Sequence, residues 1–492
     1  MLFNSEPFVL GFLPAVLAGY FLAGRLGGAR AALAFVIVAS LFFYGWWNPP
    51  FVLLLAGSIG GNYAIGQHLL HLAGTQRDRA ARAWLAAGVT ANLALLGWFK
   101  YAGFLAGSVA ALFGADAPEL HIFLPLAISF FTFQQIMFLV DSRQAARPDG
   151  GFLAYAAFVA FFPHLIAGPI VRPAEIIPQL LAPDIARPRQ AALCDGATIF
   201  LLGLAKKLVL ADLFARFADV GFDAAAHGAQ LTFFSAWYAA LAYALQIYFD
   251  FSGYSDMAIG LARMLNVRFP LNFASPYQAR DIAAFWRRWH ITLGGFLRDY
   301  LYIPLGGSRA GHWKRVRNLM LTMLACGLWH GAAWRFVLWG GLHGVFLVGH
   351  AGWRRAGLRL WAPVAQALTL LAVVAAWVPF RATGMATALS VLGGMAGLHG
   401  IALPAMIVQF LPALGMLARP VPLLAHLGAA RTLSFPEVSA CLALGWGIVL
   451  GAPHLHELGA RARSLALTAS FAFTVQGLFF APKVVPFLYF RF

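Results

Sequence analysis

Charged side chains are scarce in this sequence. Asp, Glu, Lys and Arg make up 11% of its 492 residues, whereas soluble globular chains carry about 25%. Apolar runs recur along the chain from Phe8 to Phe480, which excludes a soluble domain held by one membrane anchor. The runs are continuous and lack the ten-residue alternation of barrel strands. The sequence therefore predicts an all-α integral membrane protein, whose spans each need about 20 residues.

Cysteine and several catalytic motifs are also rare or missing. Three cysteines, Cys194, Cys326 and Cys441, lie in or beside apolar runs and form no CxxC pair, so no disulfide framework or zinc site is implied. The sequence has no HExxH, no GxxxxGK[ST] and no GxSxG, which argues against zinc hydrolysis, ATP hydrolysis and a serine elbow. We therefore expect neither a metal site nor a permanently bound cofactor.

Acidic residues are outnumbered by basic ones, and the formal net charge is +17. In a soluble protein that excess would suggest nucleic acid, but in a membrane protein Lys and Arg collect in cytoplasmic loops. Arg25 and Arg30 lie in the first loop, WNPP carries no basic residue, and the third loop holds Arg77, Arg79 and Arg82. This alternation predicts an external N-terminus, cytoplasmic basic loops and no nucleic-acid partner. The first apolar run has no basic segment before it, so we expect a retained helix and not a cleaved signal.

The apolar runs set the expected organisation. They predict helices near 8–24, 31–47, 51–72, 82–99, 121–140, 152–168, 194–213, 231–249, 318–330, 334–350, 364–380, 386–416, 437–452 and 464–480. About eleven to thirteen of these would cross the membrane, with re-entrant and interfacial pieces besides. No repeat of 20–50 residues is visible. We expect one membrane domain over 1–492, with N-terminal helices (1–150), a catalytic core (151–350) and C-terminal helices (351–492).

Residues 268–317, here called the basic belt, hold nine basic residues and two acidic ones. Trp286, Trp289 and Tyr300 are interleaved with the arginines, a pattern typical of an amphipathic helix at the membrane interface. Because Arg forks recognise phosphate, the belt is a candidate docking site for a coenzyme A thioester. The alternative is a cytoplasmic loop that obeys the positive-inside rule and binds nothing.

Two carboxylates follow an apolar run in QIYFDFSGYSDMAIG. Ionisable groups at membrane depth are functional candidates by default, which singles out Asp250 and Asp256. Alternatively, Asp250 ends its helix, with Ser252 and Gly253 forming a turn.

Four histidines lie in apolar or aromatic surroundings: His164, His290, His330 and His343. A neutral imidazole is tolerated in such a site and titrates near neutrality, so it suits a general base within a membrane. For each one the alternative is a hydrogen-bonded structural histidine. Cys326 lies four residues before His330, on the same helix face, so a Cys–His dyad is conceivable. A buried packing thiol is the favoured interpretation.

Taken together, four segments resemble the membrane-bound O-acyltransferase family, in its bacterial alginate O-acetyltransferase branch. They are PLAISFFTFQQIMFLVD (125–141), FFPHLIAGPIVRP (161–173), the segment from YFDFSGYSDMAIG through FWRRWHITL to YIPLGG (248–307), and LWHGAAWRFVLWGGLHG (328–344). The final PFLYFRF (486–492) is similar to the aromatic terminus of that branch, with Arg491 where a glutamine is expected. The resemblance implies an irregular helical bundle with a funnel and a tunnel that reach a buried histidine.

The resemblance also implies roles for residues. His330 in WHG would be the catalytic histidine, and His290 in FWRRWHITL the second family histidine, nearer the cytoplasm. The residues expected to bind substrate are Asp250, Tyr254, Asp256, Trp286, Arg287, Arg288 and Trp329.

The same resemblance implies the reactants and the location. The donor would be acetyl-CoA or a similar acyl thioester. The acceptor would be an exopolysaccharide such as alginate, or a periplasmic partner acetyltransferase that passes the acetyl group on. The protein would be a multi-pass protein of the bacterial inner membrane, surrounded by lipid.

Other activities fit the same composition. One is a D-alanyl transferase that takes its acyl group from a carrier protein for teichoic acid. Others are a protein or lipid acyltransferase with a long acyl chain, a transporter without chemistry, and a membrane scaffold. The scaffold gives no reason for histidines at these positions.

Overall fold

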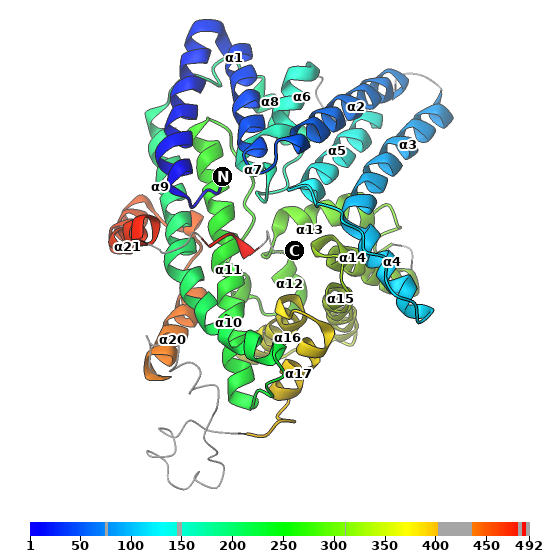
Figure 1. The fold of residues 1–492 in the computed structure, drawn as a ribbon, viewed down its shortest axis with the longest axis vertical. Helices are drawn as coiled ribbons and strands as arrows, with labels where there is room; N and C mark the ends of the chain where they lie inside the picture. The colour runs from blue at the N-terminus through cyan, green and yellow to red at the C-terminus, as the bar shows by residue number, and fades with distance from the viewer. Residues whose placement is uncertain (74–76, 145–149, 310, 402–434, 481–484, 489–492) are drawn as a thin grey trace. The chain divides into compact units, whose positions relative to one another are not determined.

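The computed structural model describes residues 1–73, 77–144, 150–309, 311–401, 435–480 and 485–488. Throughout these residues the secondary structure is helical, with no strand. The all-α prediction is therefore confirmed for the described chain (Figure 1). The chain divides into two compact units, each described on its own below. The division into a single membrane domain stays a prediction.

The first unit comprises Met1–Leu204, Gly253–Asn272 and Ala460–Arg491. Its helices are η1 (Pro7–Phe12), α1 (Leu13–Gly45), α2 (Pro50–Ala73), α3 (Asp78–Leu96), η2 (Gly97–Tyr101), α4 (Ala102–Leu112), α5 (Ile128–Arg143), α6 (Gly151–Ala160), α7 (Phe162–Leu165), α8 (Pro173–Leu180), nearly all of α9 (Gln190–Ala205), the last part of α11 (Phe233–Met264), and α21 (Ala460–Phe480).

Helix α1 is a hairpin of two helices and not one rod. Gly28 interrupts it with φ 70° and ψ −167°, a conformation that glycine adopts without steric cost. In Figure 1 the ribbon of α1 runs to the top of the view and returns. A Cβ added to Gly19 would lie 2.2 Å from the Phe35 ring, so the two arms pack closely. This confirms the predicted helices at 8–24 and 31–47.

Buried amides join α2, α3 and α5. Asn92 on α3 donates to Asn62 on α2 at 2.6 Å, and Ser58 on α2 donates to Gln135 on α5 at 2.9 Å. Such paired polar groups avoid the cost of an unsatisfied amide in an apolar interior. The three helices are therefore fixed in register by hydrogen bonds as well as by apolar packing.

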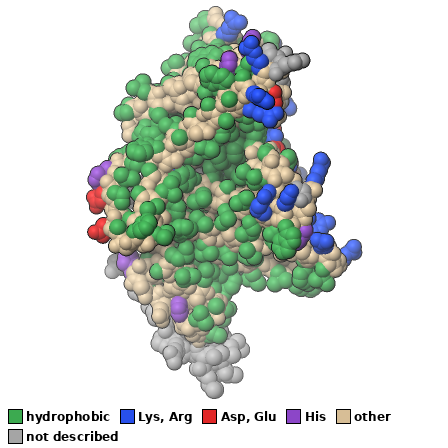
Figure 2. Space-filling model, turned by 90° about the vertical axis from the view of Figure 1, so that its right-hand side faces the viewer, with side chains coloured by type: hydrophobic (Ala, Val, Ile, Leu, Met, Phe, Trp, Pro, Cys, Tyr) green, Lys and Arg blue, Asp and Glu red, His purple; other side chains and the backbone are tan. Residues whose placement is uncertain are grey.

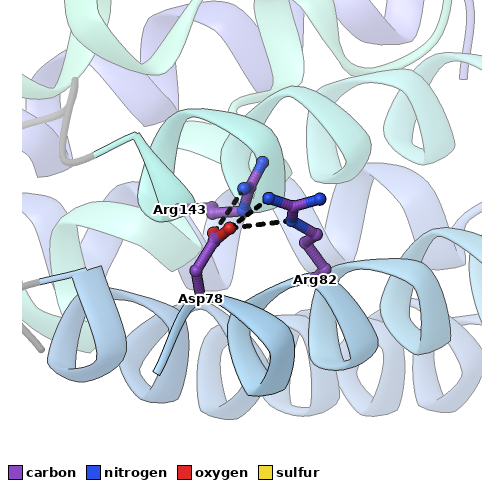
Figure 3. Close-up of polar contacts among 3 residues, drawn as sticks. All are labelled: Asp78, Arg82 and Arg143. Atoms are coloured by element: carbon purple, nitrogen blue, oxygen red, sulfur yellow. Dashed lines mark hydrogen bonds and ion pairs between the residues drawn. The ribbon is translucent and has the colours of Figure 1, made fainter. Parts of the chain in front are cut away.

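A surface ion cluster joins α3 to α5 again. Asp78 accepts hydrogen bonds from Arg82 Nε and from Arg143 Nη2, both at 2.8 Å (Figure 3). Asp78 is also the first residue of α3, where a negative charge complements the helix dipole. Exposed pairs of this kind contribute little stability, so the cluster mainly orients the two helix ends.

The second unit comprises Ala205–Ser252 and Phe273–Gly459. Its helices are η3 (Lys206–Ala211), α10 (Asp212–Ala226), most of α11, η4 (Pro276–Gln278), α12 (Ile282–Trp286), α13 (Ile291–Leu297), η5 (Arg298–Tyr302), α14 (His312–His330), α15 (Trp334–Arg355), α16 (Ala362–Arg381), α17 (Met385–Met395), α20 (Phe435–Gly451) and η7 (Leu455–Glu457).

Helices α14 and α15 approach each other through glycine. A Cβ added to Gly327 would lie 2.2 Å from the Phe336 carbonyl oxygen, and one added to Gly340 would lie 2.3 Å from the Met323 carbonyl oxygen. Small residues allow helix backbones to come this close. The two glycines thus hold the end of α14 against the start of α15, where WHG lies.

The basic belt does not form the single amphipathic helix that its aromatic spacing suggested. Its described residues include η4, α12, a turn, α13, the π-helical η5 and the start of α14. Trp289, expected at the interface, is 2% exposed. Its indole packs against Trp377 of α16, with ring centroids 4.8 Å apart, so burial against α16 overrides the interfacial placement.

Several described helices suit a membrane. Pro7–Gly45, Asp78–Leu112 and Ala362–Arg381 are long and apolar enough to cross one, and Gly151–Ala160, Met385–Met395 and Glu437–Gly451 are shorter apolar helices. Hydrophobic side chains cover much of the surface drawn in Figure 2. The predicted run 386–416 is helical in α17 up to Met395 and is a turn or irregular from 396 to 401. Residues 402–416 and the terminal residues 489–492, Arg491 among them, lie outside the described residues.

Candidate active site

His330 is the last residue of α14, and its imidazole lies in an aromatic cage. Its ring centroid is 4.9 Å from Trp329, 5.0 Å from Trp339 and 5.1 Å from Phe380, with all three rings meeting it edge to face. The side chain is 4% exposed. Edge-to-face packing fixes the orientation of aromatic rings, and the cage excludes most water from the imidazole. The cage thus holds the imidazole in an orientation and a water-poor environment that suit proton transfer.

His290 lies in the turn between α12 and α13, with a left-handed φ of 42°. This conformation is uncommon for a residue with a side chain and often marks a functional site. The imidazole is fully buried, and its ring centroid lies 4.8 Å from that of Phe251. It also lies 6.0 Å from Trp329, the indole that contacts His330. The structure therefore brings the two predicted histidines to the same tryptophan, although 39 residues separate them in sequence.

Burial lowers the pKa of the His290 imidazole from its usual 6.5 to about 3. Because burial disfavours the charged form, His290 is neutral at physiological pH. A neutral imidazole can donate one hydrogen bond and accept another. It can therefore orient a carbonyl or a hydroxyl without adding a charge to the site.

His343, on α15, belongs to the same aromatic cluster. Its Nδ1 accepts a hydrogen bond from Trp286 Nε1 at 3.3 Å, and its ring meets Trp339 at 4.8 Å. Trp339 therefore contacts both His330 and His343. The predicted substrate residue Trp286 is committed to this internal contact and orients α12 against α15. Sequence reasoning noted His343 but gave it no role.

Asp250 occupies the middle of α11 and does not end the helix, because the helix continues to Met264. The cap-and-turn alternative is therefore wrong. Its Oδ1 lies 2.7 Å from Lys207 Nζ, and the same ammonium lies 2.8 Å from Asp212 Oδ1. The Lys207 and Asp250 side chains are 2% and 4% exposed. Buried charges require such pairing, so Asp250 holds η3 and α10 to α11 through Lys207.

Tyr254 and Asp256 lie further along α11 but belong to the first unit. The centroid of the Tyr254 ring lies 4.9 Å from that of Phe3 and 4.5 Å from that of Phe487. Residues near both ends of the sequence therefore pack against α11. Asp256 is 5% exposed and packs where Gly203 allows α9 to approach. His164 also lies in this unit, where its Nδ1 is 2.9 Å from Gln134 Nε2.

The arginines of the basic belt differ in their surroundings. Arg287 is exposed, whereas Arg288 is half-buried and reaches the Ser275 carbonyl oxygen at 3.5 Å. Arg298 forms two hydrogen bonds to Asp299, at 2.6 and 3.0 Å, so its charge is already compensated. Arg287 is the predicted substrate residue that is best placed to meet a ligand in solution.

Sequence reasoning missed Arg335. Its Nη1 donates to the Phe380 carbonyl oxygen at 2.8 Å, and its guanidinium lies 4.1 Å from the centre of the Phe336 ring. Since the Phe380 ring contacts His330, Arg335 fixes one wall of the histidine cage. Its position directly after the WHG turn was the only available signal. Cys326, one helical turn before His330, is fully buried, as expected of a packing thiol.

Two comparisons with known proteins bear on this site. The model of the MBOAT, membrane-bound O-acyltransferase family matches residues 119–398, a stretch that contains both His290 and His330. The chain is 42% identical to the peptidoglycan O-acetyltransferase of Helicobacter pylori over 433 residues, which cover 82% of this chain and 81% of that protein. It is 43% identical to the probable alginate O-acetylase of Pseudomonas aeruginosa over 394 residues, which cover 79% and 73%.

A more distant relative is the teichoic acid D-alanyltransferase of Streptococcus thermophilus. The identity is 26% over 241 residues, which cover 47% of this chain and 57% of that protein. The family model spans more than half of the chain, and the two relatives above exceed 40% identity over most of it. The chain is therefore an O-acyltransferase with multiple membrane helices, and it belongs to the membrane-bound O-acyltransferase family.

Proposed function

We propose that this protein transfers acetyl groups from a cytoplasmic thioester to hydroxyl groups of a cell-envelope glycan, with His330 as the general base. The observation that supports this best is that two buried histidines pack against Trp329. The ring centroid of Trp329 lies 4.9 Å from that of His330 and 6.0 Å from that of His290. Acyl transfer to a hydroxyl needs a base, an oriented carbonyl and exclusion of water. His330 supplies the base and its aromatic cage excludes water, while neutral His290 is suited to orient the carbonyl.

The proposed reaction is a direct displacement. His330 accepts the proton of the acceptor hydroxyl while the hydroxyl oxygen attacks the thioester carbonyl carbon. A C–O bond forms and the C–S bond breaks. The thiolate leaves and takes the proton from His330, which gives an acetyl ester, a free thiol and a neutral histidine. General base catalysis of this kind contributes about 10²–10⁴-fold to a rate.

The donor we propose is acetyl-CoA, bound as a substrate and not as a resident cofactor. Arg287, Lys314 and Arg315, which are all exposed residues of the basic belt, suit its phosphates, because guanidinium and ammonium groups bind phosphate oxygens. The family fold requires an acyl donor but does not identify it. The D-alanyl alternative, with a carrier protein as donor, has weaker support because the related enzyme matches about half of the chain at 26% identity.

The acceptor class is a glycan, and its identity is open between two kinds. One relative is named for peptidoglycan and the other for alginate, at nearly equal identity. We propose that the acetyl group crosses the bacterial inner membrane and reaches the glycan directly or through a periplasmic partner acetyltransferase.

The test uses the purified full-length chain in lipid nanodiscs, with radiolabelled acetyl-CoA, D-alanyl carrier protein, and peptidoglycan and alginate oligosaccharides. We expect acetyl-CoA to be consumed and one glycan to be labelled, and His330→Ala to lower the transfer rate by about 10²-fold or more. Tryptophan fluorescence and the elution volume of the variant should match the wild type. Full activity in His330→Ala would disprove its role as base, and labelling from the carrier protein alone would favour the D-alanyl alternative.

A further inference from the structure

A cavity in the first unit lies apart from every residue assigned above. It has a volume of about 590 Å³ and lies between the α1 hairpin and the loop that joins α8 to α9. One wall carries Phe21, Leu22 and Arg25, and the other carries Ala186 and Arg187. Each wall thus presents one arginine, beside apolar side chains.

The loop wall is held rigidly. Asn266, after the end of α11, donates from Nδ2 to the carbonyl oxygens of Ile185 at 2.7 Å and Arg187 at 2.8 Å. The Asn266 side chain is 8% exposed, so these bonds are shielded from competing water. A Cβ on Gly24 would lie 2.3 Å from the Ala186 Cβ, which means that α1 can approach the loop only through glycine. The cavity is therefore formed by fixed contacts and does not depend on a loose loop.

Its electrostatics favour an anion. Within the part of the chain that the structure describes, no hydrogen bond or ion pair engages the guanidinium of Arg25 or of Arg187. Asp184, which also lines the cavity, is paired with Arg189. Two positive charges therefore remain to be balanced, and Arg guanidinium groups bind phosphate oxygens in bidentate fashion.

The apolar surroundings point to an amphiphile. Leu22 and Leu26, which flank Arg25 on the same arm of α1, are 57% and 79% exposed. In a membrane protein such side chains face lipid. The α1 hairpin turns at Gly28 just beyond them, so the cavity lies where lipid-facing surface gives way to basic residues. This arrangement suits a phosphate headgroup whose acyl chains continue along the helix.

We propose that this cavity binds the phosphate headgroup of an anionic phospholipid, with Arg25 and Arg187 contacting the phosphate from opposite walls. The lipid holds the turn of α1 to the α8–α9 loop. It is distinct from the donor and the acceptor, and the proposal does not depend on the acetyl-transfer reaction.

The experiment is native mass spectrometry of the full-length chain with phosphatidylglycerol, phosphatidylcholine or inorganic phosphate. The test variant is Arg25→Gln/Arg187→Gln. The matched control is Arg30→Gln/Arg79→Gln, which removes the same charge from exposed arginines of the same unit outside the cavity. We expect tighter binding of phosphatidylglycerol than of phosphatidylcholine by the wild type and the control. The test variant should bind phosphatidylglycerol about tenfold more weakly or worse, as expected for two lost charge-assisted contacts.

A second variant, Ala29→Phe, fills the cavity and leaves its charge unchanged. It should also lose the preference for phosphatidylglycerol, and it serves as the test if the double variant does not fold. Equal losses in the test and control variants would show a general charge effect and overturn the proposal. It would also fail if Ala29→Phe bound phosphatidylglycerol like the wild type, or if inorganic phosphate displaced the lipid at equal concentration and so assigned the cavity to free phosphate.

Discussion

At the scale of single residues, Trp329 contacts both candidate catalytic histidines. It can serve them together because it directly precedes His330 on α14 and its ring also lies 6.0 Å from His290. The two histidines differ in their settings, however. His330 ends a helix, whereas His290 occupies a left-handed turn and is fully buried. Different roles for two similar side chains follow from such differences in environment.

The pH dependence of acetyl transfer should separate these roles. Burial lowers the pKa of His290 to about 3, so this side chain stays neutral between pH 5 and pH 8 and takes up a proton only in stronger acid. We expect His290→Gln to lower kcat by about 10²-fold without changing the shape of the pH–rate profile over that range. Rates measured from pH 5 to pH 8 would check this. A displaced acidic limb in His290→Gln would mean that His290 titrates during the reaction.

At the scale of helices, two contacts set the frame of the site: the glycine contact of α14 with α15 and the ion cluster that joins η3, α10 and α11. The first is steric, because Gly327 and Gly340 bring two backbones together. The second is electrostatic, because Lys207 neutralises carboxylates from two neighbouring helices.

The glycine contact predicts opposite effects for one substitution at two places on α15. Gly340→Ala would place a methyl group 2.3 Å from the Met323 carbonyl oxygen, and such overpacking costs about 1–3 kcal/mol. Gly349→Ala meets nothing within 4 Å and should stabilise the helix by about 0.4–1 kcal/mol. Thermal unfolding in detergent measures both. Equal midpoints for the two variants would contradict the close helix contact.

The ion cluster predicts that partial removal is worse than joint removal. Lys207→Met leaves a carboxylate that is 4% exposed without its ammonium, which should cost about 3–5 kcal/mol of folding free energy. Lys207→Met/Asp250→Asn removes both charges of the buried pair and should recover part of that loss. The unfolding midpoints of the wild type, Lys207→Met, Asp250→Asn and the double variant form a double-mutant cycle. Additive losses would show that Lys207 and Asp250 do not stabilise each other.

At the scale of the whole molecule, the sequence predicted many of the long helices because apolar runs are local signals. It did not predict α10, the continuation of α11 to Met264, or the start of α5 at Ile128 in place of 121. His330 was singled out by its resemblance to the family histidine, and its role as catalytic base stays a prediction; the structure shows that it is buried. Contacts between distant residues could not be predicted. Lys207 stands after an apolar run and has the pattern of a helix end, while its partner Asp250 lies on another helix. The aromatic residues of the basic belt had interfacial spacing, yet Trp289 is buried against Trp377.

The alternation of basic loops predicts how the whole chain lies in the membrane. In a protein whose own cysteines are replaced by alanine, Arg79→Cys should react with an impermeant maleimide only when the cytoplasmic face is open. Asn48→Cys, in the loop without basic residues, should react from outside. Labelling of intact and of inverted vesicles measures this difference. The reverse pattern would invert the predicted orientation of the N-terminal helices.

The pairing of Lys207 with Asp250 also has a consequence for how the protein is made. If α11 entered the bilayer alone, its central carboxylate would cost about 2.5–3.5 kcal/mol on the scale of translocon insertion. Lys207 precedes α11 in the chain and so leaves the ribosome first. It is available as a counter-ion when Asp250 emerges. During biosynthesis we therefore expect η3 and α10 to remain next to the translocon until α11 has been made, so that the three segments enter the membrane together.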